Sequence, residues 1–513
     1  MAGTSFTTPS TPFSFRDFSG GLNSTAGSLG LGNNESSDLR NVDFNKFGSI
    51  LKRNGYTYLN ATAISSSPTN DGLHWYEAVL SSTLTRKMIT VSDGKLWKMD
   101  DLDGTWDNIT GTLTITEGNQ CDFDNFLNEV YIVNGVDAPF KWSGSGNGSV
   151  FTVPTGLTTA KFVKQFNNYL FLANVTVSGT VHQSRIYWSN IKNTGTWTAT
   201  DFIEVAKDDG QDITGIRVLS DRLVIYKRRS IYNMFFTGDS DIPFILPGGG
   251  KSNSAVGCVA PFSIQELENG HIFLSYDGWY FYDGNNSYKI SEKITTTLLE
   301  TNTTRLSQAR SCVQKNKNRY LCALPASSET ENNLVFVFDI FNNSWSIYNG
   351  MKCSSMATVY VDGVDERPYF ADYSGYTYRA DTGSDDYPLK VQTAINFYYR
   401  TNWIHYDDLV DQKGVPHIYI YFQTSNSVLT IEYSFDFETA NQFSNTMNMS
   451  SGTAVYGSAI YGVDVYASSG GRVQRRDLTG RGRVVRFSFS NSTISETIQL
   501  DGLGMQAHLE TNV

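Results

Sequence analysis

The stretch HIFLSYDGWYFYDG, residues 271–284, contains two short runs of alternating apolar residues around an Asp-Gly pair. Asp277 and Gly278 suit a two-residue hairpin turn, because tight hairpin turns need a positive φ that glycine adopts without steric cost. The period of two in the flanking residues places one row of side chains on a buried face. The stretch therefore predicts a β-hairpin.

Similar segments recur between about residue 70 and residue 380, and their turns are spaced roughly 40 to 50 residues apart, as in propeller blades of four strands each. They include KMITVSDGKLWKM (87–99), NEVYIVNGVDAPFKW (128–142), DRLVIYKRRSIYNMFF (221–236) and PYFADYSGYTYRAD (368–381). One small sheet cannot bury both of its faces, whereas blades in a ring pack face on face. We predict a β-propeller of six or seven blades; a row of β-sandwiches is the alternative.

The composition favours an all-β protein. The chain has 513 residues, with 29 Tyr, 31 Phe and 9 Trp, and only 18% of its residues are charged. Aromatic and β-branched side chains suit a pleated, half-buried surface. This length is large enough for two or three domains.

The two ends of the chain lack the hairpin repeat. Residues 1–60 predict an N-terminal arm with a short helix over 34–42 and a hairpin that turns near Gly48. The arm either wraps the first domain or docks on a neighbouring subunit. Residues 61–390 are assigned to the propeller, and the longer alternating strands of residues 391–513 predict a C-terminal β-sandwich. A second short helix is predicted within residues 289–309.

Charge and hydropathy exclude several classes of protein. The net charge of −11 argues against a protein that coats DNA, because sequence-independent affinity for DNA comes from Lys and Arg that neutralise phosphates. The sequence shows neither a signal peptide nor an apolar stretch of about 18 residues, so we expect no membrane span. The five cysteines form no C-x-x-C pair and are expected to be reduced and buried.

No motif predicts catalysis, a cofactor or a metal site. The segment ILPGGGKS (245–252) lacks the leading glycine of a phosphate-binding loop. The six histidines stand alone, without a second His or Cys at metal-ligand spacing, and no G-x-S-x-G segment occurs. We therefore expect a protein that is not an enzyme, with no catalytic residues, no cofactor and no metal.

One basic cluster stands out in this acidic chain, in RVQRRDLTGRGRVVRF (472–487). Its members are Arg472, Arg475, Arg476, Arg481, Arg483 and Arg486. The guanidinium fork binds carboxylates and phosphates through two parallel hydrogen bonds. The cluster is thus a candidate contact for an acidic partner protein; a solvated hairpin loop and a nucleic-acid contact are the alternatives.

The N-terminal stretch DFSGGLNSTAGSLGLGNNESSDLRNVDFNKFGSILKRNGY resembles the opening of a group of tailed-bacteriophage virion proteins. That group begins with a Gly-Gly-Leu-Asn turn, an Asn-Glu-x-x-Asp-Leu-x-Asn-Val segment and a Gly-Ser-x-x-x-Arg-x-Gly-Tyr hairpin. The matching positions here are 20–23, 34–42 and 48–56. The strands DRLVIYKRRSIYNMFF and NGHIFLSYDGWYFYDG are also similar to that group.

The resemblance implies a β-propeller tail protein of short-tailed phages, similar to hub or nozzle proteins that assemble as a homohexamer around the DNA channel. It implies a location in the virion tail after synthesis in the host cytoplasm, with the tail adaptor and other tail proteins as partners. Genomic DNA would pass along the channel at ejection without specific binding, and an acidic wall would keep phosphates from adhering. The alternative is a receptor-binding or glycan-binding propeller at the tail periphery.

Overall fold

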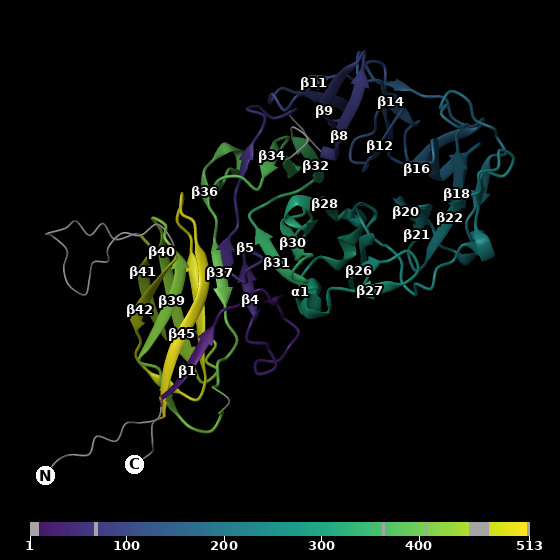
Figure 1. The fold of residues 1–513 in the computed structure, drawn as a ribbon. Helices are drawn as coiled ribbons and strands as arrows, with labels where there is room; N and C mark the ends of the chain where they lie inside the picture. Colours follow the sequence, from purple (N-terminus) through teal and green to yellow (C-terminus); the bar gives the residue numbers. More distant parts are fainter. Residues whose placement is uncertain (1–9, 66–69, 362–364, 407, 451–470, 510–513) are drawn as a thin grey trace, which may run out of the picture.

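The computed structural model describes residues 10–65, 70–361, 365–406, 408–450 and 471–509. A β-propeller and a β-sandwich lie side by side, and the chain passes from one to the other more than once (Figure 1). The predicted all-β fold, a propeller with a C-terminal β-sandwich, is confirmed.

The propeller has seven blades among the described residues, and blades 1 to 6 are four-stranded antiparallel sheets whose strands follow chain order. Blades 1 to 3 comprise β8 (Asn70–Leu80), β9 (Thr83–Ser92), β10 (Lys95–Asp100), β11 (Asp107–Asn108), β12 (Asp122–Phe126), β13 (Glu129–Val133), β14 (Phe140–Trp142), β15 (Ser149–Val150), β16 (Leu157–Phe166), β17 (Tyr169–Val177), β18 (Thr180–Trp188) and β19 (Phe202–Glu204). Blades 4 to 6 comprise β20 (Ile213–Leu219), β21 (Arg222–Lys227), β22 (Ile231–Phe236), β23 (Phe244–Ile245), β24 (Gln265–Leu267), β25 (Gly270–Ser275), β26 (Gly278–Tyr282), β27 (Ser287–Lys289), β28 (Arg310–Gln314), β29 (Arg319–Leu324), β30 (Leu334–Asp339) and β31 (Ser344–Asn349).

Blade 7 closes the ring with a strand from the other end of the chain. It contains β32 (Ser355–Val361), β33 (Asp365–Ala371) and β34 (Thr377–Ala380), and then β7 (Tyr56–Tyr58), β35 (Asp385–Asp386) and β36 (Thr393–Ala394). Strand β7 pairs antiparallel with β34, so that Tyr56 lies opposite Ala380. The first strands of successive blades contact one another around the centre, and β32 meets β8. The last blade cannot leave the ring without separating from the N-terminal segment.

The hairpin of residues 271–284 forms as predicted, but its turn lies one residue earlier. Ser275 pairs with Gly278, so Tyr276 and Asp277 make the turn. Gly278 is needed for a close contact instead: a Cβ there would lie 2.1 Å from Ser291 Oγ. The Asp277 carboxylate accepts hydrogen bonds from the Tyr280 hydroxyl and from Lys289, which hold the turn in place.

Helices are few and short in the described residues. The α-helix α1 (Thr295–Leu299) confirms the helix expected within residues 289–309, and Leu298 faces the core. The 3-10 helices are η1 (Lys207–Asp209), η2 (Pro247–Gly249), η3 (Pro261–Ser263), η4 (Glu292–Ile294), η5 (Thr303–Gln308), η6 (Lys315–Lys317) and η7 (Pro388–Lys390). Among the helices of the described ranges, none has the length and apolar character needed to cross a membrane.

The sandwich consists of two sheets. The first holds β1 (Ser10–Phe15), β5 (Val42–Phe44), β6 (Ile50–Lys52), β38 (Lys413–Gly414), β39 (His417–Gln423), β42 (Gly471–Asp477), β43 (Arg481–Gly482) and β45 (Gln499–Leu509). The second holds β4 (Asp38–Arg40), β37 (Phe397–Arg400), β40 (Val428–Phe435), β41 (Phe443–Asn448) and β44 (Val485–Asn491). A separate pair is formed by β2 (Gly21–Leu22) and β3 (Glu35–Ser36).

The N-terminal segment is therefore woven into both domains. Strand β1 pairs with β45, β4 pairs with β37 and β6 pairs with β45, all within the sandwich, while β7 belongs to the propeller. The predicted hairpin is confirmed, because Phe44 lies opposite Ile50 in the β5–β6 pair.

The short helix predicted over residues 34–42 is wrong, since this stretch forms β3, β4 and the start of β5. Its polar residues make tertiary contacts in place of a helix cap. The Glu35 carboxylate accepts hydrogen bonds from the Gly32 amide and the Asn23 side chain, and the Ser36 hydroxyl donates to the Arg400 carbonyl. These bonds offer the backbone an alternative to helix, as short polar side chains do in turns.

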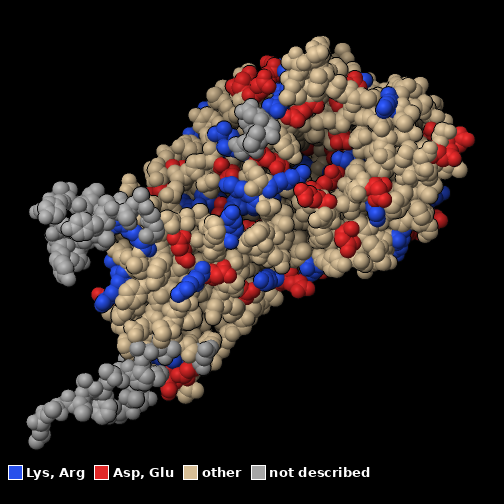
Figure 2. All heavy atoms as spheres, viewed as in Figure 1, with Lys and Arg blue, Asp and Glu red and all other residues tan. Residues whose placement is uncertain are grey.

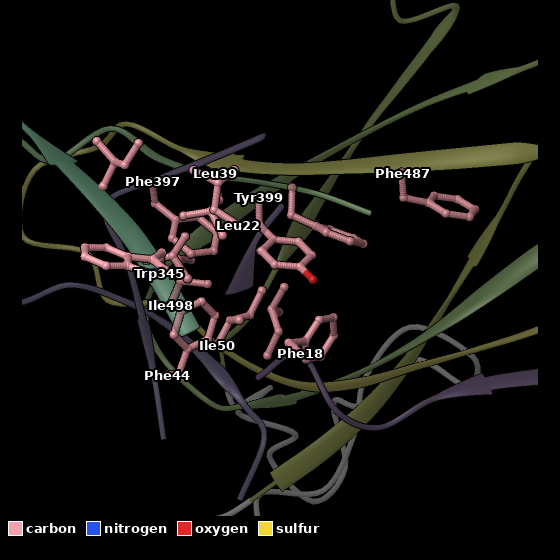
Figure 3. Close-up of a cluster of buried hydrophobic side chains, with 14 of the residues drawn as sticks. Phe18, Leu22, Leu39, Phe44, Ile50, Trp345, Phe397, Tyr399, Phe487 and Ile498 are labelled. Carbon is pink, nitrogen blue, oxygen red and sulfur yellow. The ribbon is translucent and has the colours of Figure 1, made fainter. Parts of the chain in front are cut away.

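A single hydrophobic core joins the two domains. Figure 3 shows Leu22 and Leu39 of the N-terminal segment in one cluster with Trp345 of blade 6 and with Phe397 and Tyr399 of the sandwich. All of these side chains are buried, and Trp345 also packs against Trp279 of blade 5 at a ring distance of 4.9 Å. The propeller and the sandwich are thus packed as one body through this shared core.

The five cysteines are free and buried, which agrees with the prediction of reduced thiols. Cys322 lies opposite Ser311 on β28, and Cys312 lies opposite Leu321 on β29. Burial raises the pKa of the Cys322 thiol to about 12.

Candidate functional site

The residues that carry the family resemblance gather at the junction between the propeller and the sandwich. The centre of this junction is Arg53, which is fully buried just before β7. Its guanidinium makes two hydrogen bonds to the Asp386 carboxylate, at 2.8 and 2.5 Å, and donates to the Asn349 carbonyl and to Asn41 Oδ1. Burial alone would lower the pKa of Arg53, but the Asp386 carboxylate raises it above the usual value.

A second ion pair ties the same segment to blade 6. The Asp43 carboxylate of β5 accepts hydrogen bonds from Arg319 at 2.9 Å and from the Tyr348 hydroxyl. The amide of Asn41 donates to the Ile347 carbonyl, which extends the contact along β31. Because β5 belongs to the sandwich, these bonds hold a sandwich strand directly against the propeller.

The sandwich side of the junction is equally well connected. The Lys52 ammonium donates to Asn491 Oδ1 at 2.9 Å and to the Thr493 carbonyl at 3.1 Å. The Asp385 carboxylate of blade 7 accepts hydrogen bonds from the amide and the hydroxyl of Ser495. Buried charged groups are therefore satisfied on both sides, as stability requires.

Two glycines of the resemblance are required by close approach of backbones. A Cβ on Gly21, whose φ is +70°, would lie 2.7 Å from the Ser344 Cβ of blade 6. A Cβ on Gly55 would lie 1.8 Å from the Asp385 carbonyl oxygen. Real Cβ atoms do not approach so closely, so only glycine fits at these two places.

The cavity that the described residues leave at the junction is too small for a ligand of ordinary size. The cavity lined by Asp43, Arg53, Arg319 and Tyr348 has a volume of about 20 Å³, close to the space that one water occupies. The bonded side chains of the junction can transmit force between the domains. The cavity beside its charged groups is too small to bind a substrate.

The six arginines of the basic cluster are spread over both sheets of the sandwich. Arg472, Arg475 and Arg476 lie on β42, Arg481 lies on β43, Arg483 follows it, and Arg486 lies on β44. Figure 2 shows basic side chains at the edge of the sandwich where β42 runs. The structure thus brings three of the six together on one edge strand.

The arginines differ in their surroundings. Arg475 is exposed and pairs with Asp477 at 2.8 Å. Arg483 donates from Nε to the Val410 carbonyl, and the Arg486 guanidinium lies 4.3 Å from the centre of the Trp403 ring. Burial lowers the pKa of Arg476 and of Arg486. An acidic partner would therefore meet mainly the outward-facing side of this edge.

The centre of the propeller forms a third candidate site. Figure 2 shows the ring hollowed at its centre, with acidic and basic side chains around the hollow. One part has a volume of about 460 Å³ and an adjoining part about 300 Å³, and Arg217 and Glu266 line both. The larger part is lined mainly by the first strands β8, β12, β20, β24, β28 and β32, and Lys164 of β16 lines the smaller part.

Most of the charges in this channel are paired. Lys164 lies 3.2 Å from Glu266 and 3.6 Å from Asp124, and Arg217 lies 3.5 Å from Asp122. Burial opposes the charge of Glu266, but Lys164 and its other neighbours lower the pKa of Glu266 to about 2. The sequence did not reveal these residues as a group, because they lie in the first strands of different blades. The signal that could have identified them is a charged residue within a strand that is expected to be buried.

His271 lies behind the channel wall and is fully buried. Its Nδ1 accepts a hydrogen bond from the Tyr226 hydroxyl at 2.8 Å, and its Nε2 donates to the Val218 carbonyl at 2.9 Å. Burial lowers the pKa of His271 to about 4, although Glu266 opposes this shift. The neutral ring satisfies both neighbours, so His271 is a structural residue of blades 4 and 5.

No protein-family model matches the chain, and no curated protein matches it. Similar solved structures include BamB from Moraxella catarrhalis, at 11% identity over 64% of this chain and 97% of that chain, with a TM-score of 0.36. YCF48 bound to D1 peptide is similar at 11% identity over 67% of this chain and 97% of that chain, with a TM-score of 0.39. BBS1N in complex with ARL6DN reaches 12% identity, 65% and 99% coverage and a TM-score of 0.40. Similarities this low carry no argument about function.

Proposed function

We propose that this protein is a non-enzymatic structural subunit of a short-tailed bacteriophage tail. In this proposal several copies form a ring, a hub or nozzle, that closes or extends the tail tube and conducts DNA at ejection. The observation that carries the proposal is the location of the motif residues: those at positions 20–56 that resemble the phage group fasten the propeller to the sandwich.

A tail conduit must be stiff under load and must release DNA without retaining it. The junction supports the first requirement, because strands of one N-terminal segment belong to both domains and its buried charges are paired. The net charge of −11 supports the second requirement, since an acidic protein repels phosphates. The arginine-bearing edge at β42 is the proposed contact for an acidic neighbour in the tail.

A specific observation also favours the second candidate, a glycan-binding protein of the tail periphery. The exposed ring of Tyr421 lies over Gly502 and Gly504, where a Cβ would lie 3.7 and 3.6 Å from ring carbons. A tyrosine ring that lies flat on a sheet offers its face for stacking on a sugar. Tyr419 stands two residues away on the same face of β39.

Cryo-EM of the intact particle that carries this chain tests the proposal. We expect density for a ring of copies on the tail axis, with the propeller and the sandwich in the relative position seen here. A chain found away from the axis, combined with glycan binding that the Tyr421→Ala variant loses, would favour the second candidate.

A further inference from the structure

Arg310, the first residue of β28, faces the propeller channel and has no carboxylate partner. It is 5% exposed and lines the 460 Å³ cavity. Its Nε donates to the Ser354 carbonyl at 2.8 Å and its Nη2 contacts the Asp71 carbonyl at 3.4 Å. The guanidinium lies over the Phe262 ring at 4.4 Å. In the described part of the chain, no acidic side chain lies within ion-pair distance of it.

The acidic groups around the cavity are engaged elsewhere. Asp122 is 3.5 Å from Arg217 and accepts a hydrogen bond from the Val163 amide. Glu266 is 3.2 Å from Lys164 and accepts from the Val218 amide. Burial raises the pKa of Asp71 to about 7, although the Gly118 amide, which donates to its Oδ2, and the charge of Arg310 lower it. Arg310 therefore has no carboxylate in ion-pair contact among the described residues.

Two further donors of the same cavity are unsatisfied. The indole Nε1 of Trp75 and the hydroxyl of Ser355 are buried and have no hydrogen-bond partner. Both residues line the cavity that Arg310 lines. A buried polar group without a partner costs free energy, and a buried charge without a counter-ion costs more. All three residues line the same cavity, and an acceptor-rich anion is the kind of ligand that such donors bind.

We infer that the propeller channel holds a binding site for a small oxyanion-bearing molecule, with Arg310 as the ion-pair partner and Trp75 and Ser355 as additional donors. The ligand class is a phosphate ester or a carboxylate. A cavity of about 460 Å³ has the size of a metabolite site. The Phe262 ring beneath the guanidinium restricts its movement and leaves its hydrogen-bonding edge for the anion. This inference does not depend on the proposed tail function.

Isothermal titration calorimetry of the full chain with two probes, inorganic phosphate and acetate, tests the site in a buffer free of other oxyanions. We expect saturable binding of one or both, and the preferred probe identifies the ligand class. Arg310→Met should weaken binding about tenfold or more, as the loss of a charged hydrogen bond implies. Arg222→Met, which removes the same charge at a partly exposed position outside the channel and outside the arginine cluster, is the control and should bind as the wild type does.

A second measurement separates binding from a purely structural role. In the same buffer, Arg310→Met should unfold at an equal or higher denaturant concentration than the wild type, because it removes an unpaired buried charge. A structural role predicts a clear loss of stability instead. Should Arg310→Met fail to fold, the site is overturned as well, unless Trp75→Phe and Ser355→Ala each weaken anion binding. A wild-type protein that binds neither probe at millimolar concentration overturns the inference outright.

Discussion

Two buried arginines of this protein differ in whether a carboxylate balances their charge. Arg53, at the junction, makes two hydrogen bonds to Asp386 and bonds to backbone and side-chain oxygens. Arg310, in the propeller channel, has only carbonyl contacts and an aromatic ring. A charge that is completely paired fixes the relative position of the elements around it, whereas an unpaired charge beside a cavity is available to a ligand.

The largest expected effect comes from breaking the junction pair. Arg53→Met leaves the Asp386 carboxylate buried without a partner, which costs about 3–5 kcal/mol of the free energy of unfolding. Chemical denaturation followed by tryptophan fluorescence measures this loss. Arg222→Met, which removes a partly exposed arginine paired with Asp221, is the control and should cost under about 1 kcal/mol. An Arg53→Met cost as small as that of the control would show that the pair does not hold the junction.

A slightly smaller effect is expected from the shared core. Leu39→Ala removes a fully buried side chain between blade 6 and the sandwich and should cost about 2–5 kcal/mol. The wild type should unfold in a single calorimetric transition, because the two domains share this core. Two separate transitions in the wild type would mean that the propeller and the sandwich unfold independently. The shared core would then not couple the two domains.

His271 should make the free energy of unfolding depend on pH. The pKa of His271 is about 4 in the fold, against an ordinary value of 6.5. Between these values the unfolded chain binds a proton that the folded chain does not, so the folded state loses stability as pH falls from about 6.5 to 4. The shift corresponds to on the order of 3 kcal/mol. His271→Gln, which cannot titrate, should flatten the stability curve in this window, measured by denaturation at each pH; an unchanged slope would contradict the assignment.

The local features of the fold were predictable from the sequence, and the non-local features were not. Alternating apolar residues around tight turns predicted the hairpins, because a hairpin is specified by residues close in sequence. Nothing local reveals that Tyr56 pairs with Ala380, or that β1 pairs with β45, since these contacts span most of the chain. The residues 34–42 show the same limit, because contacts of Glu35 and Ser36 with distant segments replace the predicted helix cap.

The candidate sites divide in the same way. The arginines at 472–486 were visible as a cluster in an acidic sequence, yet the fold distributes them over β42, β43 and β44. The motif at 20–56 was visible as a resemblance, and its physical role became clear only when Arg53 met Asp386 across more than half of the chain. In the sequence, Arg310 is only a charged residue at the start of a strand. Its interest comes from the carboxylate partner that it lacks in the described fold, which the sequence does not show.

The smallest effect on stability is expected at the sandwich edge, where a surface pair offers a contrast to both buried arginines. Arg475 and Asp477 are largely exposed, so Arg475→Ala should change the free energy of unfolding by less than about 1 kcal/mol. The same substitution should weaken the association of copies with one another or with an acidic tail neighbour. Added salt should weaken the association of the wild type in the same way, because it screens the charge of Arg475. Analytical ultracentrifugation across ionic strength measures the association. If Arg475→Ala destabilised the fold as strongly as Arg53→Met does, the edge would belong to the structural framework, and its assignment as a contact surface would be wrong.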